Sequence, residues 1–178
     1  MYRGQEVCGI ASRRPSSIHF EVKYTMDDFN KDLERGKVGE KLVAAALTAR
    51  GHTVTDLSDN WEYRRKDIDF LLTSATGQQT YLEVKTDDKS EQTGNLFIEY
   101  SNQNNIKHNY QGWYCYCEAT FIAFVQQSKH KAHIVSRYDL INNINNNNYR
   151  TAASCNSCGF LMPVTALTKL PSYFLLDI

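Results

Sequence analysis

The sequence lacks an excess of charge of either sign. Lys and Arg together number 20, and Asp and Glu together also number 20. A nucleic-acid-binding domain often carries a net positive charge, so the neutral total gives no support for such binding. The neutral total does not exclude it either, because a basic groove can be balanced by acidic surface and by the carboxylates of a site. The content of 22% charged and 12% aromatic residues is typical of a globular protein.

The sequence also lacks any run of about 20 apolar residues, the length that a membrane span needs. Its first residues contain no apolar core of the kind found in signal peptides. Five cysteines are an odd number without a secretory context, which favours a reducing, cytoplasmic location. With 178 residues, the chain has room for one domain with a proper core. We expect a flexible N-terminal arm over residues 1–18 and a single domain over residues 19–178.

Two apolar runs with a short polar break between them lie at the centre of the pattern. Phe70–Leu72 and Tyr81–Val84 flank the polar segment Thr73–Gln79, which includes a Thr-Gly pair. Apolar runs separated by such a break predict two strands joined by a hairpin turn.

Charged side chains stand at one end of this predicted hairpin. Asp69 precedes the first strand, and Glu83 and Lys85 lie near the end of the second. Residues two apart in a strand project to the same face, so Glu83 and Lys85 project together, away from Leu82 and Val84. Mg²⁺ prefers oxygen ligands and binds one or two carboxylates together with waters and phosphate oxygens. The hairpin therefore predicts a divalent-cation site.

A long helix is expected before the hairpin, from an N-cap at Thr25–Asp28 to about Arg50, where Gly51 ends it. On a helical wheel, Glu40 falls within an apolar stripe, and a carboxylate there is costly unless its charge is used. The alternative is a Glu at the edge of the stripe that pairs with a neighbouring lysine. The stripe consists of Leu33, Gly36, Val43, Ala44 and Leu47, and the lysines are Lys37 and Lys41.

The ordered set of helix Glu40, strand Asp69, and Glu83-x-Lys85 resembles the PD-(D/E)XK nucleases, which have the restriction-endonuclease-like fold. The segment Gly36-Lys37-Val38-Gly39-Glu40, followed by Leu47 and Gly51, is similar to the first helix of archaeal-type Holliday-junction resolvases. The resemblance covers about residues 36–100. It implies an α/β domain with a mixed central sheet flanked by helices.

The resemblance also implies a function, which is Mg²⁺- or Mn²⁺-dependent hydrolysis of DNA phosphodiester bonds. Asp69, Glu83 and the backbone carbonyl of Val84 would hold the ion, and Glu40 would bind a second ion or its waters. Lys85 would orient the attacking water or stabilise the phosphate as a point charge. Branched DNA, nicked ends and plain duplex remain open as substrates, and nucleases of this kind often act as homodimers.

Asp67 competes with Asp69 for the role of metal ligand. Both side chains face the same way if the strand starts early. Asp69 directly precedes the apolar run, as the metal-binding Asp of the family does, so we favour Asp69. The Pro that usually precedes the family motif is absent, and Ile68 stands in its place.

Basic residues surround this region. Arg64, Arg65 and Lys66 are interpreted either as phosphate-binding residues or as exposed loop residues. The same choice, between a DNA-contacting arm and a solvated tail, applies to Arg13 and Arg14.

The remaining pattern adds strands to the sheet. Alternation over residues 18–24 predicts a half-buried strand, and residues 94–100 predict a strand close to a third central one. The most apolar run, residues 119–125, predicts a central strand buried on both faces, with residues 133–135 as its partner. A polar loop is expected over residues 86–93, a short helix over residues 136–144, and exposed loop positions for the histidines near residue 130.

Cys155 and Cys158 have the spacing of a zinc knuckle, and Cys115 with Cys117, on a strand, or a nearby His, could complete four ligands. A second tight knuckle is lacking, so free thiols are favoured over structural Zn²⁺. The alternative to a nuclease is a non-catalytic scaffold with the same fold that binds DNA or a protein partner. No membrane partner is expected.

Overall fold

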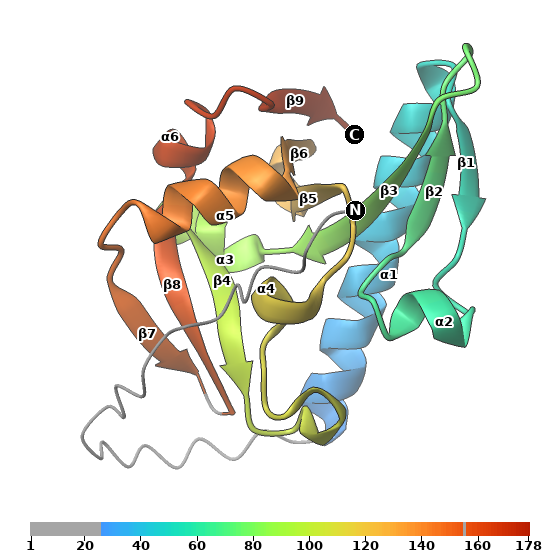
Figure 1. Ribbon diagram of the computed structural model, residues 1–178. Coiled ribbons are helices and arrows are strands. Elements are labelled where there is room, and N and C mark those ends of the chain that lie inside the picture. The colour runs from blue at the N-terminus through green and yellow to red at the C-terminus, as the bar shows by residue number, and fades with distance from the viewer. Residues whose placement is uncertain (1–25, 155) are drawn as a thin grey trace, which may run out of the picture.

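The computed structural model describes residues 26–154 and 156–178, and its centre is a six-stranded sheet with the order β1-β2-β3-β5-β6-β9 (Figure 1). β3 and β5 pair in parallel, and the other neighbouring strands pair antiparallel. The predicted mixed central sheet with flanking helices is therefore confirmed. Its strands are β1 (Thr53–Asp56), β2 (Phe70–Thr73), β3 (Gln79–Thr86), β5 (Phe121–Gln126), β6 (Lys131–Ser136) and β9 (Phe174–Asp177).

The hairpin at the centre of the sequence pattern is present as β2 and β3. Phe70 faces Leu82 across the pair, and Thr73 faces Gln79. The connecting turn depends on Gly77, whose φ of 82° lies in the region that side chains disfavour, and whose N–H donates to the Ser74 carbonyl. The sequence therefore predicted both strands and the turn between them.

A second sheet of three strands has the order β4-β8-β7, with both pairs antiparallel. The expected place of residues 94–100 beside the central strands was wrong, because β4 belongs to this second sheet. The predicted polar loop was also wrong, since residues 88–93 form α3, which ends at Gly94 with a φ of 69° and turns the chain away from the central sheet. The strands of the second sheet are β4 (Asn95–Asn102), β7 (Thr151–Ser154) and β8 (Ser157–Pro163).

The long helix α1 (Met26–Ala49) covers one face of the central sheet next to the hairpin (Figure 1). Val43 and Leu47 are buried against the sheet, and Gly51 follows the helix with a φ of 88°. The predicted apolar stripe is wrong at its start, because Leu33 is 49% exposed. The stripe that contacts the sheet begins later in the helix, near Gly39.

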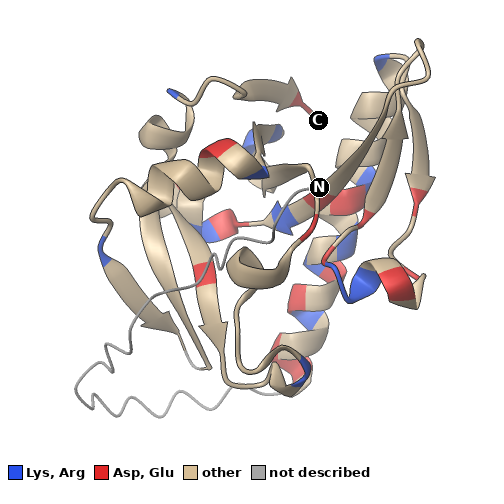
Figure 2. Ribbon diagram, viewed as in Figure 1, with Lys and Arg blue, Asp and Glu red and all other residues tan. Residues whose placement is uncertain are grey.

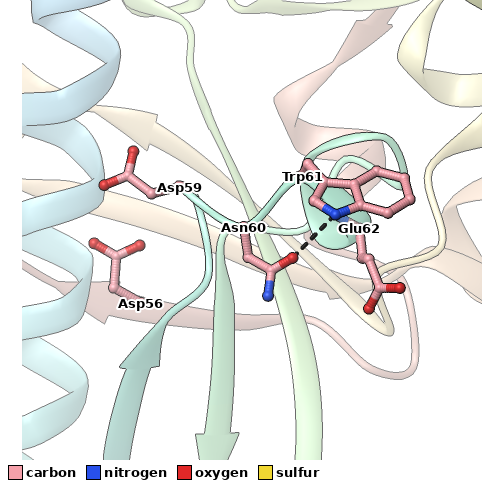
Figure 3. Close-up of a pocket in the computed structure, with 5 residues that line it drawn as sticks. All are labelled: Asp56, Asp59, Asn60, Trp61 and Glu62. Atoms are coloured by element: carbon pink, nitrogen blue, oxygen red, sulfur yellow. Dashed lines mark hydrogen bonds between the residues drawn. The ribbon is translucent and has the colours of Figure 1, made fainter.

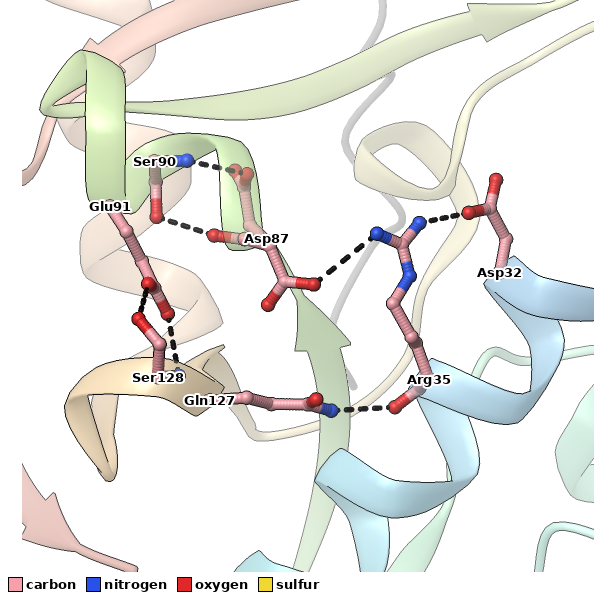
Figure 4. A network of polar contacts seen from close by, with 8 residues as sticks. Asp32, Arg35, Asp87, Ser90, Glu91, Gln127 and Ser128 are labelled. Carbon is pink, nitrogen blue, oxygen red and sulfur yellow. Dashed lines mark hydrogen bonds and ion pairs between the residues drawn. The ribbon is translucent and has the colours of Figure 1, made fainter. Parts of the chain in front are cut away.

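Gly39 allows α1 to lie close to the sheet. A Cβ at this position would collide with the Thr86 hydroxyl of β3. One turn earlier, Arg35 pairs with Asp32 and with Asp88, and its carbonyl accepts a hydrogen bond of 2.7 Å from Gln127 (Figure 4). These contacts fix α1 against α3 and the short helix η2 immediately before Glu40. The two elements are α3 (Asp88–Thr93) and η2 (Gln127–Lys129).

Shorter helices and the second sheet cover the opposite face of the central sheet, where Ile122 and Phe124 lie in a core with Leu96 and Met162 (Figure 1). The predicted strand around Cys115 was wrong, since that segment is a short helix with Trp113 and Tyr114 buried. The predicted helix near residues 136–144 is present. These elements are α2 (Trp61–Arg64), η1 (Ile106–His108), α4 (Trp113–Tyr116), α5 (Arg137–Asn145) and α6 (Val164–Leu167).

Several expectations lie outside the described residues: the arm over residues 1–18 with Arg13 and Arg14, the strand over residues 18–24, and Cys155. Whether the chain is a single domain stays a prediction. In the ranges 26–154 and 156–178, none of the helices combines the length and apolar character needed to cross a bilayer.

Candidate active site

The start of β2 fixes Asp69 beside β3. The Asp69 N–H donates to the Leu82 carbonyl at 3.1 Å, and one Asp69 carboxylate oxygen accepts from the Val84 N–H at 2.8 Å. The Leu57 N–H donates to the Asp69 carbonyl at 2.7 Å. The first two bonds hold Asp69 against the strand that carries Glu83, and the third ties it to the segment after β1. The structure therefore brings together the two carboxylates that the sequence singled out.

Glu83 and Lys85 project from the face of β3 opposite α1, as the alternation in the sequence predicted. Leu82 and Val84 pack in the core under α1. Glu83 is only 3% exposed, and its Oε1 lies 2.5 Å from the Lys85 Nζ. Its second oxygen, Oε2, is buried without a hydrogen-bond partner. A buried carboxylate oxygen without a donor is costly, which makes it a ready acceptor for a ligand.

Lys85 has two further neighbours. Its Nζ lies 2.7 Å from Asp67 Oδ2, and 5.4 Å from the centre of the Trp113 ring. An ammonium group over a tryptophan face is attracted by the ring electrons. Asp67 and Asp69 thus take different places: Asp69 binds the backbone of β3, and Asp67 pairs with the lysine. They do not lie on one strand, since β2 begins at Phe70.

The site contains closely spaced charges in a poorly hydrated place. Burial raises the pKa of Glu83 well above its ordinary value, and the charges of Asp67 and Asp69 add to this. Burial also raises the pKa of Asp69, against the opposing effect of Lys85. Burial alone would lower the pKa of Lys85, but the charges of Asp67 and Glu83 raise it well above its ordinary value. Both carboxyl groups therefore favour protonation unless a positive charge stabilises their anions.

Glu40, on α1, interacts electrostatically with Asp69 and Lys85. Burial raises the pKa of Glu40 to about 7, and the charges of Asp69 and Asp56 contribute, while Lys37 and Lys85 lower it. Within the described part of the chain, no hydrogen bond or ion pair joins Glu40 to Asp69, Glu83 or the lysines. Its coupling to the site is through the electric field alone.

The site fits a hard divalent cation, since all of its candidate ligand atoms are oxygens. One of them, Glu83 Oε2, is buried without a hydrogen-bond partner. Among residues 26–154 and 156–178, no three His, Cys, Asp or Glu side chains gather around one point as in a preformed metal cage. Mg²⁺ does not require such a cage, because it keeps several waters and binds one or two carboxylates. Asp69 and Glu83 supply that number.

Charged residues gather on α1, on α2, just before β2 and at the carboxyl end of β3, whereas β7 and β8 carry none (Figure 2). Arg64 and Arg65 are exposed, and Arg65 lies 5.6 Å above the Trp61 ring. The third predicted phosphate-binding residue, Lys66, pairs with Glu118 at 3.1 Å. The two arginines therefore face solvent, and Lys66 has a protein partner.

A pocket of about 650 Å³ is lined by residues from the end of β1 to the start of α2 (Figure 3). The carboxylates of Asp56 and Asp59 lie on its α1 side, and the exposed Trp61 closes the other (Figure 3). Asn60 Oδ1 accepts from the Glu62 N–H at 3.0 Å and caps α2. The charge of Asp56, which lines this pocket, contributes to the raised pKa of Glu40.

The sequence did not identify the aromatic side of the site. Besides Trp113, Tyr116 lies within the field of Asp67 and Lys85, and burial raises the pKa of Tyr116 to about 12. The Tyr116 ring stacks on His108 with 3.9 Å between ring centres. The run of aromatic residues before Cys117 was a signal, but it was assigned to a strand.

None of the described cysteines Cys115, Cys117 and Cys158 forms a disulfide. Burial, with the charge of Asp67, raises the pKa of Cys117 to about 12, and a protonated thiol is a poor zinc ligand. The predicted exposure of the histidines was wrong for His133, which is 7% exposed.

Comparison with known proteins gives one match, to a family model described as the uncharacterised protein family UPF0102, over residues 39–142. The match covers more than half of the chain and includes Glu40, Asp69, Glu83 and Lys85. No curated protein and no solved structure matches the chain.

Proposed function

We propose that the chain, which belongs to the uncharacterised protein family UPF0102 and has a nuclease-like fold, is a metal-dependent endonuclease that hydrolyses phosphodiester bonds in DNA. One observation carries the proposal. Asp69 and Glu83 lie side by side with Lys85, and the Oε2 of Glu83 is buried without a partner. Such an arrangement costs stability, and a bound cation would offset that cost.

In this proposal, Asp69, Glu83 and the backbone carbonyl of Val84 would hold Mg²⁺ or Mn²⁺. The ion would supply Lewis acidity and would neutralise charge that grows on the phosphate. Glu40 would accept hydrogen bonds from waters around the ion, for which a pKa of about 7 leaves it partly ionised at neutral pH.

Lys85 carries the remaining positive charge of the site. As a point charge with three donors, its ammonium orients water and stabilises the extra negative charge of the phosphate in the transition state. The exposed Arg64 and Arg65 bind backbone phosphates beside the reacting one. This assignment predicts DNA as the partner and a strong dependence of binding on salt.

The test is cleavage of labelled single-stranded, duplex, flap and four-way-junction DNA with Mg²⁺ or Mn²⁺. Glu83→Ala should reduce cutting at least about 100-fold, because both the ligand and the charge are removed. Glu34→Ala, at an exposed position on α1, is the matched control and should cut like the wild type. The junction-to-duplex ratio then decides whether branched DNA is the preferred substrate.

If no substrate is cut with either metal, the nuclease proposal is overturned. The molecule is then a scaffold of the same fold that binds DNA or a protein partner. If Glu83→Ala cuts as well as the wild type, the activity comes from a contaminant or from another site, and the assignment to this site fails.

A further inference from the structure

Asp67 occupies an unusual backbone position. It lies between α2 and β2 with a φ of 54°, in the left-handed region that residues with side chains rarely adopt. Asn and Asp tolerate this region better than other residues with side chains, but it still needs support from the surroundings. The strained backbone therefore indicates that the placement of the Asp67 side chain matters.

Two contacts maintain this backbone position. The Asp67 N–H donates to the Arg64 carbonyl at 3.2 Å, and the Cys117 thiol donates to the Asp67 carbonyl at 3.3 Å. Next to it, the Glu118 N–H donates to the Lys66 carbonyl at 2.8 Å. The turn before β2 is thus tied to the segment that follows α4.

The result of this geometry is the contact of 2.7 Å between the Asp67 carboxylate and the Lys85 Nζ. The same nitrogen lies 2.5 Å from Glu83 Oε1. Asp67 and Lys85 have side chains that are 17% and 25% exposed, so solvent screens the pair only in part. Lys85 therefore has two carboxylate partners in a poorly hydrated place.

Binding of a divalent cation would affect the two carboxylate partners of Lys85, Glu83 and Asp67, in different ways. In the proposed function, Glu83 binds the metal, so two positive charges, the metal and the Lys85 ammonium, share one carboxylate. An ammonium that loses its only partner in a buried place is costly. Asp67 gives Lys85 a second partner. The metal does not require Asp67, since Asp69 already lies beside Glu83.

We propose that Asp67 is a positioning residue that keeps Lys85 in the site when Glu83 turns to a divalent cation, and that Asp67 is not itself a metal ligand. The inference rests on the proposed function for the role of the metal, but the pairing of Asp67 with Lys85 stands without it. It assigns separate roles to the two aspartates of Asp-Ile-Asp, one to the metal and one to the lysine.

A double-mutant cycle tests the proposal, with Mn²⁺ affinity measured by titration calorimetry. The variants are Asp67→Asn, Lys85→Met and their combination. Asn accepts the same backbone conformation, so Asp67→Asn removes the charge and leaves the turn intact. With Lys85 present, Asp67→Asn should weaken Mn²⁺ binding about tenfold, because the lysine then stays with Glu83.

In the Lys85→Met background, Asp67→Asn should change the Mn²⁺ affinity by less than about twofold, because there is no ammonium left to place. Asp69→Asn is the comparison and should weaken binding strongly in both backgrounds. If Asp67→Asn weakens binding equally with and without Lys85, Asp67 is a ligand and the proposal is overturned.

Melting of the metal-free proteins gives a second measurement that does not depend on metal. Asp67→Asn should lower the melting temperature with Lys85 present and should not lower it in Lys85→Met. An equal drop in both backgrounds would show a purely structural turn and would overturn the pairing. A wild type that binds no Mn²⁺ overturns the proposed function and the metal-dependent role, while the melting cycle still decides the pairing.

Discussion

Two buried polar networks lie on the central sheet, and they differ in how completely their polar atoms have hydrogen-bond partners. In the first, His133 bonds to Tyr173 at 3.0 Å and to Gln126 at 3.2 Å, and Gln126 donates to the Ser90 hydroxyl at 2.9 Å. Ser90 in turn donates to the Asp87 carbonyl at 2.7 Å. This network is neutral, and its side chains bond to one another.

The second network consists of Asp67, Asp69, Glu83 and Lys85. It contains three carboxyl groups against one ammonium, and the Oε2 of Glu83 has no hydrogen-bond partner. A satisfied neutral network stabilises a fold, whereas a charged network with an orphaned oxygen costs stability. The comparison indicates that the first network serves the fold and the second serves a ligand.

The largest loss of stability is expected when the charged network loses Lys85, its only positively charged side chain. Lys85→Ala leaves buried carboxylates without a partner and should destabilise the metal-free protein by about 3 kcal/mol at pH 8. Urea denaturation measures this. Lys89→Ala, at an exposed position of α3, should stay within about 0.5 kcal/mol of the wild type. Equal stability of Lys85→Ala and the wild type would contradict the assigned role of the ion pairs.

Breaking the neutral network should cost somewhat less. Gln126→Met keeps the size of the side chain but removes one hydrogen-bond partner from each of His133 and Ser90, so a loss of about 2 kcal/mol is expected. The same urea experiment with and without Mn²⁺ should give the same loss, since this network has no ligand to bind. A loss that Mn²⁺ reverses would remove the distinction between the two networks. Gln103→Met, at an exposed position, is the control.

Glu40, which interacts electrostatically with the charged network, should make stability depend on alkaline pH. Since the pKa of Glu40 is raised from 4.5 to about 7, the folded state holds its proton more tightly than the unfolded state. This contribution is full below about pH 4.5 and is lost as pH rises through 7. After allowance for screening by solvent, the loss should be about 1–2 kcal/mol by pH 8.5.

Urea midpoints measured from acid to alkaline pH test this expectation. Glu40→Gln should flatten the profile around pH 7. Mn²⁺ should offset the alkaline loss, because a cation stabilises the ionised carboxylates. A wild-type profile that rises through this range would mean that Glu40 is stabilised as an anion in the metal-free protein.

The smallest loss of stability is expected from the neutral network at acid pH. Burial lowers the pKa of His133, with the charges of Lys131 and Lys129 contributing, so below the ordinary value of 6.5 the unfolded state binds more protons. Stability is therefore present above that pH and falls as the pH drops below it. His133→Gln should remove this acid-side loss in the urea profile. An unchanged acid limb would exclude His133 as its source.

The sequence predicted those parts of the fold in which the pattern is local. The hairpin, α1 and the β5–β6 pair follow from alternation, capping and apolar runs that are contained in short windows. The second sheet did not follow, because the partner of β4 is β8, about 60 residues away, and no local pattern specifies such a pairing. The short helix that carries Trp113 was missed because four aromatic or apolar residues in succession fit a strand equally well.

The same limit applies to the site. Asp69, Glu83 and Lys85 could be identified because a single hairpin carries them and the period of two aligns them. Trp113 and Tyr116 reach the site from a different part of the chain. The separate places of Asp67 and Asp69 depend on one backbone angle, the φ of Asp67, which the residue types of the segment do not fix.

The parallel pairing of β3 with β5 has a consequence for how the molecule folds. The hairpin joins neighbours in sequence and can form early, but β5 can join only after the excursion from Asp87 to Thr120 has closed, which is slow. Trp113, which contacts Lys85, lies within that excursion. We therefore expect the charges of β3 to be buried only when this slow closure occurs, after the hairpin has formed.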